Sequence, residues 1–374
     1  MCSFSFTVFV SAFMLFPTAP FHILDIGGTN FTAGLFLGLL TYGSAVSAPF
    51  TGALADRLGK RRTLVVASLT ISGLSVGYAL APSTTFLLLI VPLHGVFWSG
   101  MLTASAAYLL DLVPESRRAE GVAYWGLSTV GAIAIAPTIA FWIYDHGGWV
   151  WLCGVVALLN VAMAGIALCL EEHATHPRER APGGGFIEWR VLIVSITLFL
   201  FSFGYGGITS FVALYAEASG TPNKGAYFTA LALVILVTRP LVGTYADRIG
   251  HKKVFVPCLA LAAAGIALLL PGGSLFWLIT SAIVFGLGFG SAFPVYTAHV
   301  MQRIPASRRG AAFGSMLAAF DTGIGTGSMA LGYIIETRGY TAAFSLAAIL
   351  AAMALPYFLA VEPRLFGSSG STSR

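Results

Sequence analysis

Among the ionisable side chains inside long apolar stretches of the chain, three are candidates for chemistry: Asp321, Arg239 and His94. An ionised group at the centre of a bilayer costs at least about 2.5–3.5 kcal/mol unless it is paired or wetted, so such residues are functional candidates by default. If the surrounding stretches cross a membrane, these three side chains point to proton binding and to the binding of charged solutes.

Asp321 opens the run Asp-Thr-Gly-Ile-Gly-Thr-Gly and lies twelve residues into an apolar stretch that starts at residue 309. In a helix with a rise of 1.5 Å per residue this is about 18 Å from the start, near the bilayer midplane. A buried carboxyl group there could bind and release a proton near neutral pH. The alternative is a structural aspartate, because the small residues that follow it allow neighbouring helices to approach closely.

For Arg239 and His94 the sequence allows more than one role. Arg239 directly precedes Pro240 and could pair with an acid, bind an anionic substrate or extend toward the membrane surface. His94 could line a cavity or pack between helices.

Residue patterns typical of catalysis are not found in the sequence. There is no phosphate-binding P-loop, no His-Glu-x-x-His pair and no nucleophile elbow. We therefore expect neither an enzyme nor an ATP-driven protein, and no cofactor or metal. Cys153, Cys169 and Cys258 have no metal-ligand spacing and are interpreted as free thiols.

The amino-acid composition predicts a membrane protein. Of 374 residues, 57% are hydrophobic and 9% are charged, with a mean hydropathy of +0.85. A soluble domain averages roughly 25% charged residues, so lipid must surround most of this chain. The net charge of +5 is explained by membrane topology, and no nucleic acid is expected as a partner.

Twelve apolar runs are long enough to cross the hydrocarbon core as helices, which takes about 20 residues. The expected fold is all-α, with twelve transmembrane helices. The first run lacks a positive n-region, so we expect a span rather than a cleaved signal peptide. The runs are 4–24, 31–54, 63–81, 85–111, 119–144, 148–170, 188–216, 225–246, 254–271, 275–301, 309–335 and 340–361.

Positive charge predicts the orientation. With the N-terminus in the cytoplasm, the inside segments collect seventeen lysines and arginines, and the outside segments collect only Lys224 and Arg338. We therefore expect a multi-pass inner (plasma) membrane protein with both termini cytoplasmic. The expected domains are a six-helix bundle at 1–170, a cytoplasmic linker at 171–187, a second bundle at 188–362 and a disordered tail at 363–374.

An internal repeat connects the two halves. Gly-Ala-Leu-Ala-Asp-Arg-Leu-Gly-Lys-Arg-Arg at 52–62 recurs 191 residues later as Gly-Thr-Tyr-Ala-Asp-Arg-Ile-Gly-His-Lys-Lys at 243–253. At the same offset, Pro-Glu-Ser-Arg-Arg at 114–118 matches Pro-Ala-Ser-Arg-Arg at 305–309. Because six is an even number of spans, the repeats are expected to be parallel.

The repeated stretch resembles the loop signature of the major facilitator superfamily, Gly-x-x-x-Asp-Arg-x-Gly-Arg/Lys-Arg/Lys. The first copy matches at Gly52, Asp56, Arg57 and Gly59. The second matches at Gly243, Asp247, Arg248 and Gly250.

The resemblance implies that these eight residues form a conformational latch. An aspartate is disfavoured at the C-terminal end of its own helix, so each should have a better partner in the opposite half. For Asp56 the implied partner is the helix that starts near Gly310, and for Asp247 the helix near Glu120. Arg57 could pair with Asp111 or Glu115. These contacts would form while the cytoplasmic side is closed and break when it opens.

The resemblance also implies which helices line the transport cavity. The lining residues it suggests are His22, Trp98, Thr103, Tyr205, Thr209, Phe289, Phe293 and Tyr296. Such an aromatic lining suits a neutral or lipophilic solute. Together with Asp321, Arg239 and His94, the residues Tyr205, Phe293 and Tyr296 are the candidates for proton coupling or substrate binding. His299 is interpreted as structural.

The function implied is a secondary transporter that moves a small organic solute by alternating access. Proton-coupled efflux, an antiport, is the first interpretation, and a facilitator or importer of a sugar or metabolite is the alternative. Val91 replaces the arginine that efflux members carry four residues before the glycine at 95, which weakens the antiport assignment. A membrane sensor is a third interpretation. The expected partners are the substrate, protons and the bilayer, and the expected state is a monomer.

We predict that Asp56→Asn abolishes transport while the protein still inserts into the membrane normally. The asparagine keeps the size of the side chain but removes the charge that a helix N-terminus would stabilise. Solute flux in vesicles, normalised to inserted protein, measures the effect. Full activity in this variant would contradict the latch hypothesis.

Overall fold

The computed structural model describes residues 2–113, 118–171, 187–221, 223–305 and 308–366, without the side chains at 2, 49, 52–53, 56, 110 and 118–125. All regular elements in these ranges are helices. They are α1 (Cys2–Leu15), α2 (Ala19–Asp25), α3 (Asn30–Leu58), α4 (Lys60–Ala79), α5 (Thr84–Leu112), α6 (Arg118–Leu168), α7 (Trp189–Val194), α8 (Ile196–Ala218), α9 (Ala226–Ile249), α10 (His251–Ala267), α11 (Leu275–Met301) and α12 (Arg309–Phe366).

Nine stretches of the described residues are long and apolar enough to cross a membrane. Two of them, Gly126–Leu168 and Arg309–Phe366, contain 43 and 58 residues. Each bends at a glycine with positive φ, Gly148 at 73° and Gly339 at 81°. Because about 20 residues span the hydrocarbon core, each is long enough for two crossings. α10, with 17 residues, is not among the nine. The number of twelve spans stays a prediction.

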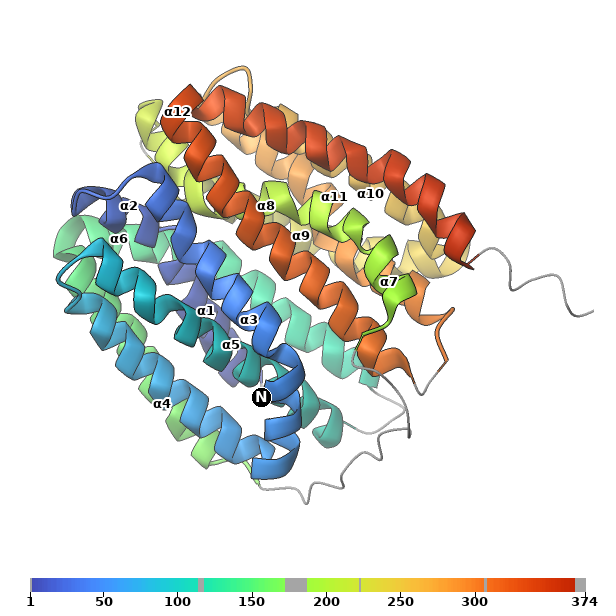
Figure 1. Cartoon of the computed structure of the whole chain (residues 1–374), viewed down its shortest axis with the longest axis horizontal. Coiled ribbons are helices and arrows are strands. Elements are labelled where there is room, and N and C mark those ends of the chain that lie inside the picture. Colours follow the sequence, from blue (N-terminus) through green and yellow to red (C-terminus); the bar gives the residue numbers. More distant parts are fainter. Residues whose placement is uncertain (1, 114–117, 172–186, 222, 306–307, 367–374) are drawn as a thin grey trace, which may run out of the picture.

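The helices gather into two bundles (Figure 1). In the first bundle α1 packs against α6, and α5 packs against α3 and α4. In the second, α8 packs against α12, and α11 packs against α9 and α10. The bundles meet along two seams, α3 with α12 and α6 with α9. In the 191-residue repeat α3 corresponds to α9, and the first part of α6 to the first part of α12, so the two seams are equivalent.

Glycines let α12 lie close to helices of both bundles. A Cβ at Gly323 or Gly327 would collide with the backbone of α8, and one at Gly325 would collide with Thr41 of α3. Small residues at such contacts allow backbones to approach closely in a membrane. The small-residue run after Asp321 therefore packs α12 between α8 and α3.

The charged motif is not the loop that the sequence predicts. α3 continues through Leu58 and α4 begins at Lys60, so Gly59 alone separates them, with φ 92°. In the second copy Gly250 separates α9 from α10 with φ 100°. Residues with a Cβ rarely adopt such values, so the last motif glycine of each copy makes the turn.

Two predicted runs are each broken in the structure. The first, 4–24, is divided into α1 and α2 by the turn at 16–18, where Pro17 lacks the N–H that a continuous helix needs. The run at 188–216 is divided at Ser195 into α7 and α8. α12 extends to Phe366, past the predicted end at 362. Most of the predicted linker and residues 367–374 of the tail lie outside the described residues.

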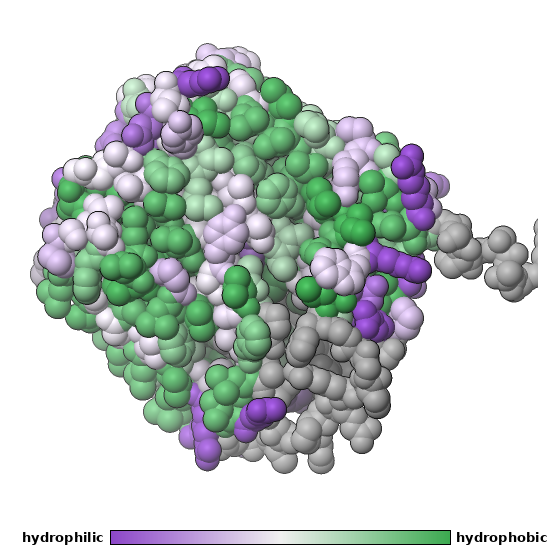
Figure 2. All heavy atoms as spheres, viewed as in Figure 1, coloured by the Kyte–Doolittle hydropathy of each residue, from purple (hydrophilic) through white to green (hydrophobic). Residues whose placement is uncertain are grey.

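Hydrophobic side chains cover most of the face shown in Figure 2, and the hydrophilic ones gather largely near its margins. Large apolar residues are also exposed on individual helices, for example Trp142, Trp151 and Phe276. An apolar surface of this extent would be unfavourable in water and is suited to lipid.

Candidate functional site

We call the end of the molecule that carries Gly59 and Gly250 the motif end, and the end with the bends at Gly148 and Gly339 the opposite end. Near the opposite end, the bundles are joined along the α3–α12 seam. The Phe31 backbone N–H donates to Glu336 over 3.1 Å, and Ser328 donates to the carbonyl of Gly34 over 2.9 Å. Hydroxyl groups of Tyr42 and Thr326 share a hydrogen bond of 2.7 Å.

The α6–α9 seam is joined in the same way. The hydroxyl of Thr229 donates to the carbonyl of Ala134 over 2.9 Å and lies 3.2 Å from the hydroxyl of Thr138. Gly225 packs so closely against Thr138 that a Cβ would collide with it. Both seams therefore hold the bundles together over the half of the molecule nearer the opposite end.

Toward the motif end, the bundles separate. In the α3–α12 seam the described hydrogen bonds stop at Ser44, whose hydroxyl donates to Asp321 over 3.4 Å. Beyond this point Phe50 of α3 is 71% exposed, and a Cβ added at Gly310 or Gly314 of α12 would have nothing within 4 Å. As far as the structure describes them, α3 and α12 are therefore separated at the motif end, and we call this end open.

Asp321 lies where this separation begins. Its side chain is partly exposed, and its hydrogen bond to Ser44 connects the two bundles. Packing of the glycines that follow it holds this part of α12 against α3 and α8. The structure therefore places the predicted carboxylate between the bundles, at the inner limit of the opening.

Aromatic rings from three helices pack together, and one of them belongs to Phe320, the residue before Asp321. Tyr205 of α8 lies 4.1 Å from Phe289 of α11, measured between ring centroids. Phe293 of α11 lies 5.0 Å from Phe320, the residue before Asp321. We call Tyr205, Phe289, Phe293 and Phe320 the aromatic stripe.

The first bundle presents a related aromatic group. Trp98 of α5 meets Phe9 and Phe16 edge to face, at centroid distances of 5.8 and 6.1 Å. Trp98 and Phe289 are equivalent positions of the 191-residue repeat. The predicted lining residues Trp98, Tyr205, Phe289 and Phe293 thus form two aromatic groups on equivalent helices.

Arg239 lies in the middle of α9 and faces α6. Its guanidinium fits beside Gly126, where an added Cβ would lie 3.3 Å from Nη1. It is half-buried and forms no hydrogen bond or ion pair with any residue that the structure describes. Of the three alternatives that the sequence left open, pairing with an acid is therefore not seen.

The side chains of two predicted candidates, His94 and Tyr296, point into the bundles to which they belong. His94 is buried, and its Nδ1 lies 3.1 Å from the hydroxyl of Tyr78 on α4. Tyr296 is also buried and shares a hydrogen bond of 2.9 Å with Ser195. Their helices were expected to line a cavity, but both side chains project from the faces that pack against neighbouring helices. The structure thus separates them from the aromatic stripe.

The charged latch residues whose side chains the structure describes are exposed in this open arrangement. Asp247 is 76% exposed and its described partner is His251 on the next helix, at 3.3 Å. Asp111, which was considered as a partner for Arg57, forms an ion pair with Lys60. Arg57 and Arg248 are exposed, and the side chain of Asp56 lies outside the described set.

Sequence reasoning missed a charged clasp at the opposite end. Lys224 lies 3.2 Å from Asp145 of the first bundle and 2.8 Å from Glu217 of its own, and it also sits 5.0 Å from the ring centroid of Phe21. Burial lowers the pKa of Lys224, but the two carboxylates outweigh burial and the net pKa is raised. The cation therefore persists at neutral pH, and its contribution to the clasp is lost as pH rises through that raised pKa.

A second missed group holds the motif end of the second bundle together. Glu362 of α12 is buried and lies 2.6 Å from Lys252, 3.0 Å from His299 and 3.5 Å from Arg303. Lys252 belongs to α10, His299 lies near the end of α11, and Arg303 follows that helix. The structural interpretation of His299 agrees with this packing.

The repeat could have revealed that group. At the 191-residue offset, Lys252, His299 and Glu362 correspond to Arg61, Tyr108 and Glu171. In the first bundle the Tyr108 hydroxyl donates to the carbonyl of Glu171 over 2.8 Å. Among the described residues no group of three His, Cys, Asp or Glu side chains could hold a metal ion.

A family model described as Major Facilitator Superfamily matches residues 1–243 and again residues 194–372. The chain belongs to the major facilitator superfamily. Its similarity to curated members extends over nearly the whole length. It is 25% identical to the MFS-type transporter YhhS of Escherichia coli strain K12, with 94% of this chain and 89% of that protein covered. A Burkholderia pseudomallei (strain 1106a) MFS-type transporter is also 25% identical, with 99% and 93% covered.

Solved structures of this superfamily share the fold. The peptide transporter POT in complex with sulfate gives a TM-score of 0.79 at 14% identity, covering 98% of this chain and 94% of that chain. The human organic anion transporter MFSD10 gives 0.69 at 16% identity, covering 96% and 97%. The fold class is thus the parallel-repeat helical fold that the sequence predicted, in a multi-pass membrane protein of a transporter family.

We predict that Lys224→Gln favours states that are open at the opposite end, because it removes the cation that joins the two bundles. Ser328, which is buried in the α3–α12 seam, is replaced by cysteine in a background without the native cysteines. Its labelling rate by a polar thiol reagent should rise about fivefold, as expected for a partly exposed ion pair worth about 1 kcal/mol.

Arg338→Gln is the matched control, because Arg338 is exposed at the same end and has no described partner. Equal labelling of the Lys224→Gln variant and the parent would show that the clasp does not control this end.

Proposed function

We propose that this transporter exports a small amphiphilic organic anion in exchange for protons, by alternating access between the two bundles. Asp321 would bind the proton, the aromatic stripe would bind the apolar part of the solute, and Arg239 would bind its anionic group. The repeated motifs would act as latches at the motif end, which the distribution of lysine and arginine predicts to be cytoplasmic.

The observation that carries this proposal is the position of Asp321. A carboxylate that accepts a hydrogen bond from the other bundle links proton binding to the contact between bundles. Hydrogen bonds to ionised groups are stronger than those to neutral groups. Protonation of Asp321 therefore weakens its bond with Ser44 and favours separation of α3 from α12 at this point, whereas loss of the proton favours their contact.

The register of the α3–α12 seam supports the latch. Phe31 pairs with Glu336, and Ser44 pairs with Asp321. A higher residue number on α3 is therefore matched with a lower residue number on α12. Continued toward the motif end, this register brings position 52 opposite Gly314 and position 56 opposite Gly310. Two glycines would then allow close approach, and an aspartate would face the start of α12, where helix N–H groups favour an anion.

Arg239 and the aromatic stripe support the choice of an amphiphilic anion. A half-buried guanidinium without a described partner, in a membrane-spanning helix, is costly unless an anion or water satisfies it. Aromatic faces bind apolar bodies. A neutral solute would leave the arginine without a counterion, so an anionic solute accounts for both features.

We predict that Asp321→Asn abolishes the dependence of transport on a pH gradient. In liposomes that contain the purified protein, solute flux driven by an imposed gradient should fall at least about tenfold, while exchange without a gradient persists, because the asparagine still accepts a hydrogen bond but binds no proton. Asp321→Glu, which can still bind a proton, should keep part of the coupling.

Gradient-driven flux at the parent level in Asp321→Asn would exclude Asp321 as the proton site. Flux that ignores the gradient in the parent protein would favour the facilitator. Absence of flux for every solute of a broad panel would favour the sensor interpretation.

We predict that Arg239→Gln raises KM for anionic aromatic solutes about tenfold or more, because a charge-assisted hydrogen bond is lost. KM for neutral solutes of the same shape should change little, and Arg239→Lys should recover part of the loss. An equal loss for anionic and neutral solutes would assign Arg239 a structural role.

A further inference from the structure

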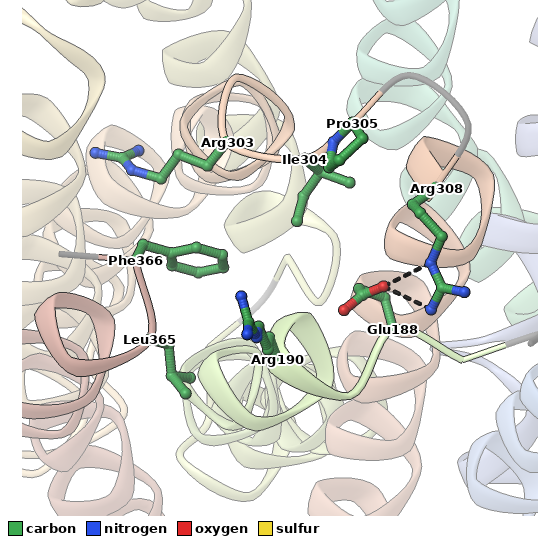
Figure 3. Close-up of a pocket in the computed structure, with 8 residues that line it drawn as sticks. All are labelled: Glu188, Arg190, Arg303, Ile304, Pro305, Arg308, Leu365 and Phe366. Carbon is green, nitrogen blue, oxygen red and sulfur yellow. Dashed lines mark hydrogen bonds and ion pairs between the residues drawn. The ribbon is translucent and has the colours of Figure 1, made fainter. Parts of the chain in front are cut away.

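A second cavity lies away from the space between the bundles, at the motif end of the second bundle (Figure 3). Its volume is about 270 Å³. It is bounded by the start of α7, by residues 303–305 and 308 between α11 and α12, and by the end of α12. The residues that line it are Glu188, Arg190, Arg303, Ile304, Pro305, Arg308, Leu365 and Phe366.

Most charges around this cavity are already compensated. Glu188 accepts two hydrogen bonds from Arg308, 2.8 Å from Nε and 2.6 Å from Nη2. Arg303 donates to the carbonyl of His299 and lies 3.5 Å from Glu362, and in Figure 3 its guanidinium points away from the cavity. These side chains leave little free charge.

Arg190 is the exception. It extends into the middle of the cavity between Phe366 and the Glu188–Arg308 pair (Figure 3). It has no hydrogen bond or ion pair with any of the described residues. The cavity therefore holds one uncompensated guanidinium between an apolar wall and a neutralised ion pair, an arrangement that suits an anion.

Exposed apolar side chains begin at the residue before Arg190, and we call them the apolar strip. Trp189, Ile193 and Ile196 follow at helical spacing on α7 and the start of α8, and all three are exposed. Tryptophan is enriched where a membrane meets water. A ligand with an anionic head and an apolar chain would satisfy the cavity and the strip together.

We propose that this cavity binds the phosphate of an anionic phospholipid head group, with Arg190 as the main donor and an acyl chain along the apolar strip. The planar guanidinium matches phosphate oxygens in pairs. Basic pockets between transmembrane helices are suited to phospholipid head groups. Free phosphate has the same chemistry as the head group, but it has no acyl chain to contact the apolar strip. The lipid should therefore bind more tightly than free phosphate.

Thermal unfolding of the purified full-length chain in detergent tests this proposal. Phosphatidylglycerol, phosphatidylcholine and inorganic phosphate are added separately, and the concentration that gives half of the maximal rise in Tm is measured. Phosphatidylglycerol should act at the lowest concentration. In Arg190→Gln that concentration should rise about fivefold, the effect expected for one arginine near a lipid surface.

Two further variants control the experiment. Arg364→Gln removes an exposed arginine from the same end of α12 that does not line the cavity, and it should leave the response to phosphatidylglycerol unchanged. Arg190→Lys keeps the charge and should lose less than Arg190→Gln. Without lipid, the Tm of all three should match the parent, because neither arginine has a described partner.

Three outcomes would overturn the proposal. Equal responses to phosphatidylglycerol and phosphatidylcholine would show that the head-group charge is not recognised. Equal losses in Arg190→Gln and Arg364→Gln would indicate diffuse attraction to the basic surface. A response to inorganic phosphate as strong as that to phosphatidylglycerol would identify a free-anion site.

Discussion

The free-energy cost of placing a charged group in lipid is the constraint on which the arrangement of this molecule depends. With 9% charged residues, the chain keeps most ionisable groups at the two ends of its helices. Where a charge is buried it is compensated, as Glu362 is by a lysine, an arginine and the imidazole of His299. Asp321 and Arg239 depart from this pattern, because the described hydrogen-bond partner of Asp321 is a serine and Arg239 has no described hydrogen-bond or ion-pair partner. Those two positions are where a proton and an anionic solute would be bound most favourably.

The two seams are the contacts that the proposed alternation between states would break and form again. Near the opposite end, hydrogen bonds and closely packed glycines join the bundles, and Lys224 connects them at the surface. Near the motif end, α3 and α12 have separated. A structure that is joined at one end and open at the other can alternate only if the joined contacts are weak enough to break. Partly exposed ion pairs and single hydrogen bonds meet this requirement.

The repeat separates shared architecture from individual function. Gly59 and Gly250 make the same turn, and Trp98 and Phe289 occupy equivalent helices. By contrast, the repeat partner of Arg239 is Ala48, and that of Asp321 is Val130. Symmetry thus governs the scaffold and the latches, whereas the residues proposed for coupling and substrate binding occur once.

The sequence by itself determined the membrane class, the duplicated organisation and the positions of the repeated motifs, because composition and a constant offset between repeats can be read directly along the chain. The tertiary structure decided which faces meet. His94 and Tyr296 lie on the predicted helices but point into their own bundles, because neighbouring positions on a helix differ by about 100° and packing selects among them. Only folding brings Lys224 to Asp145, since 79 residues separate them and neither lies in a repeated motif.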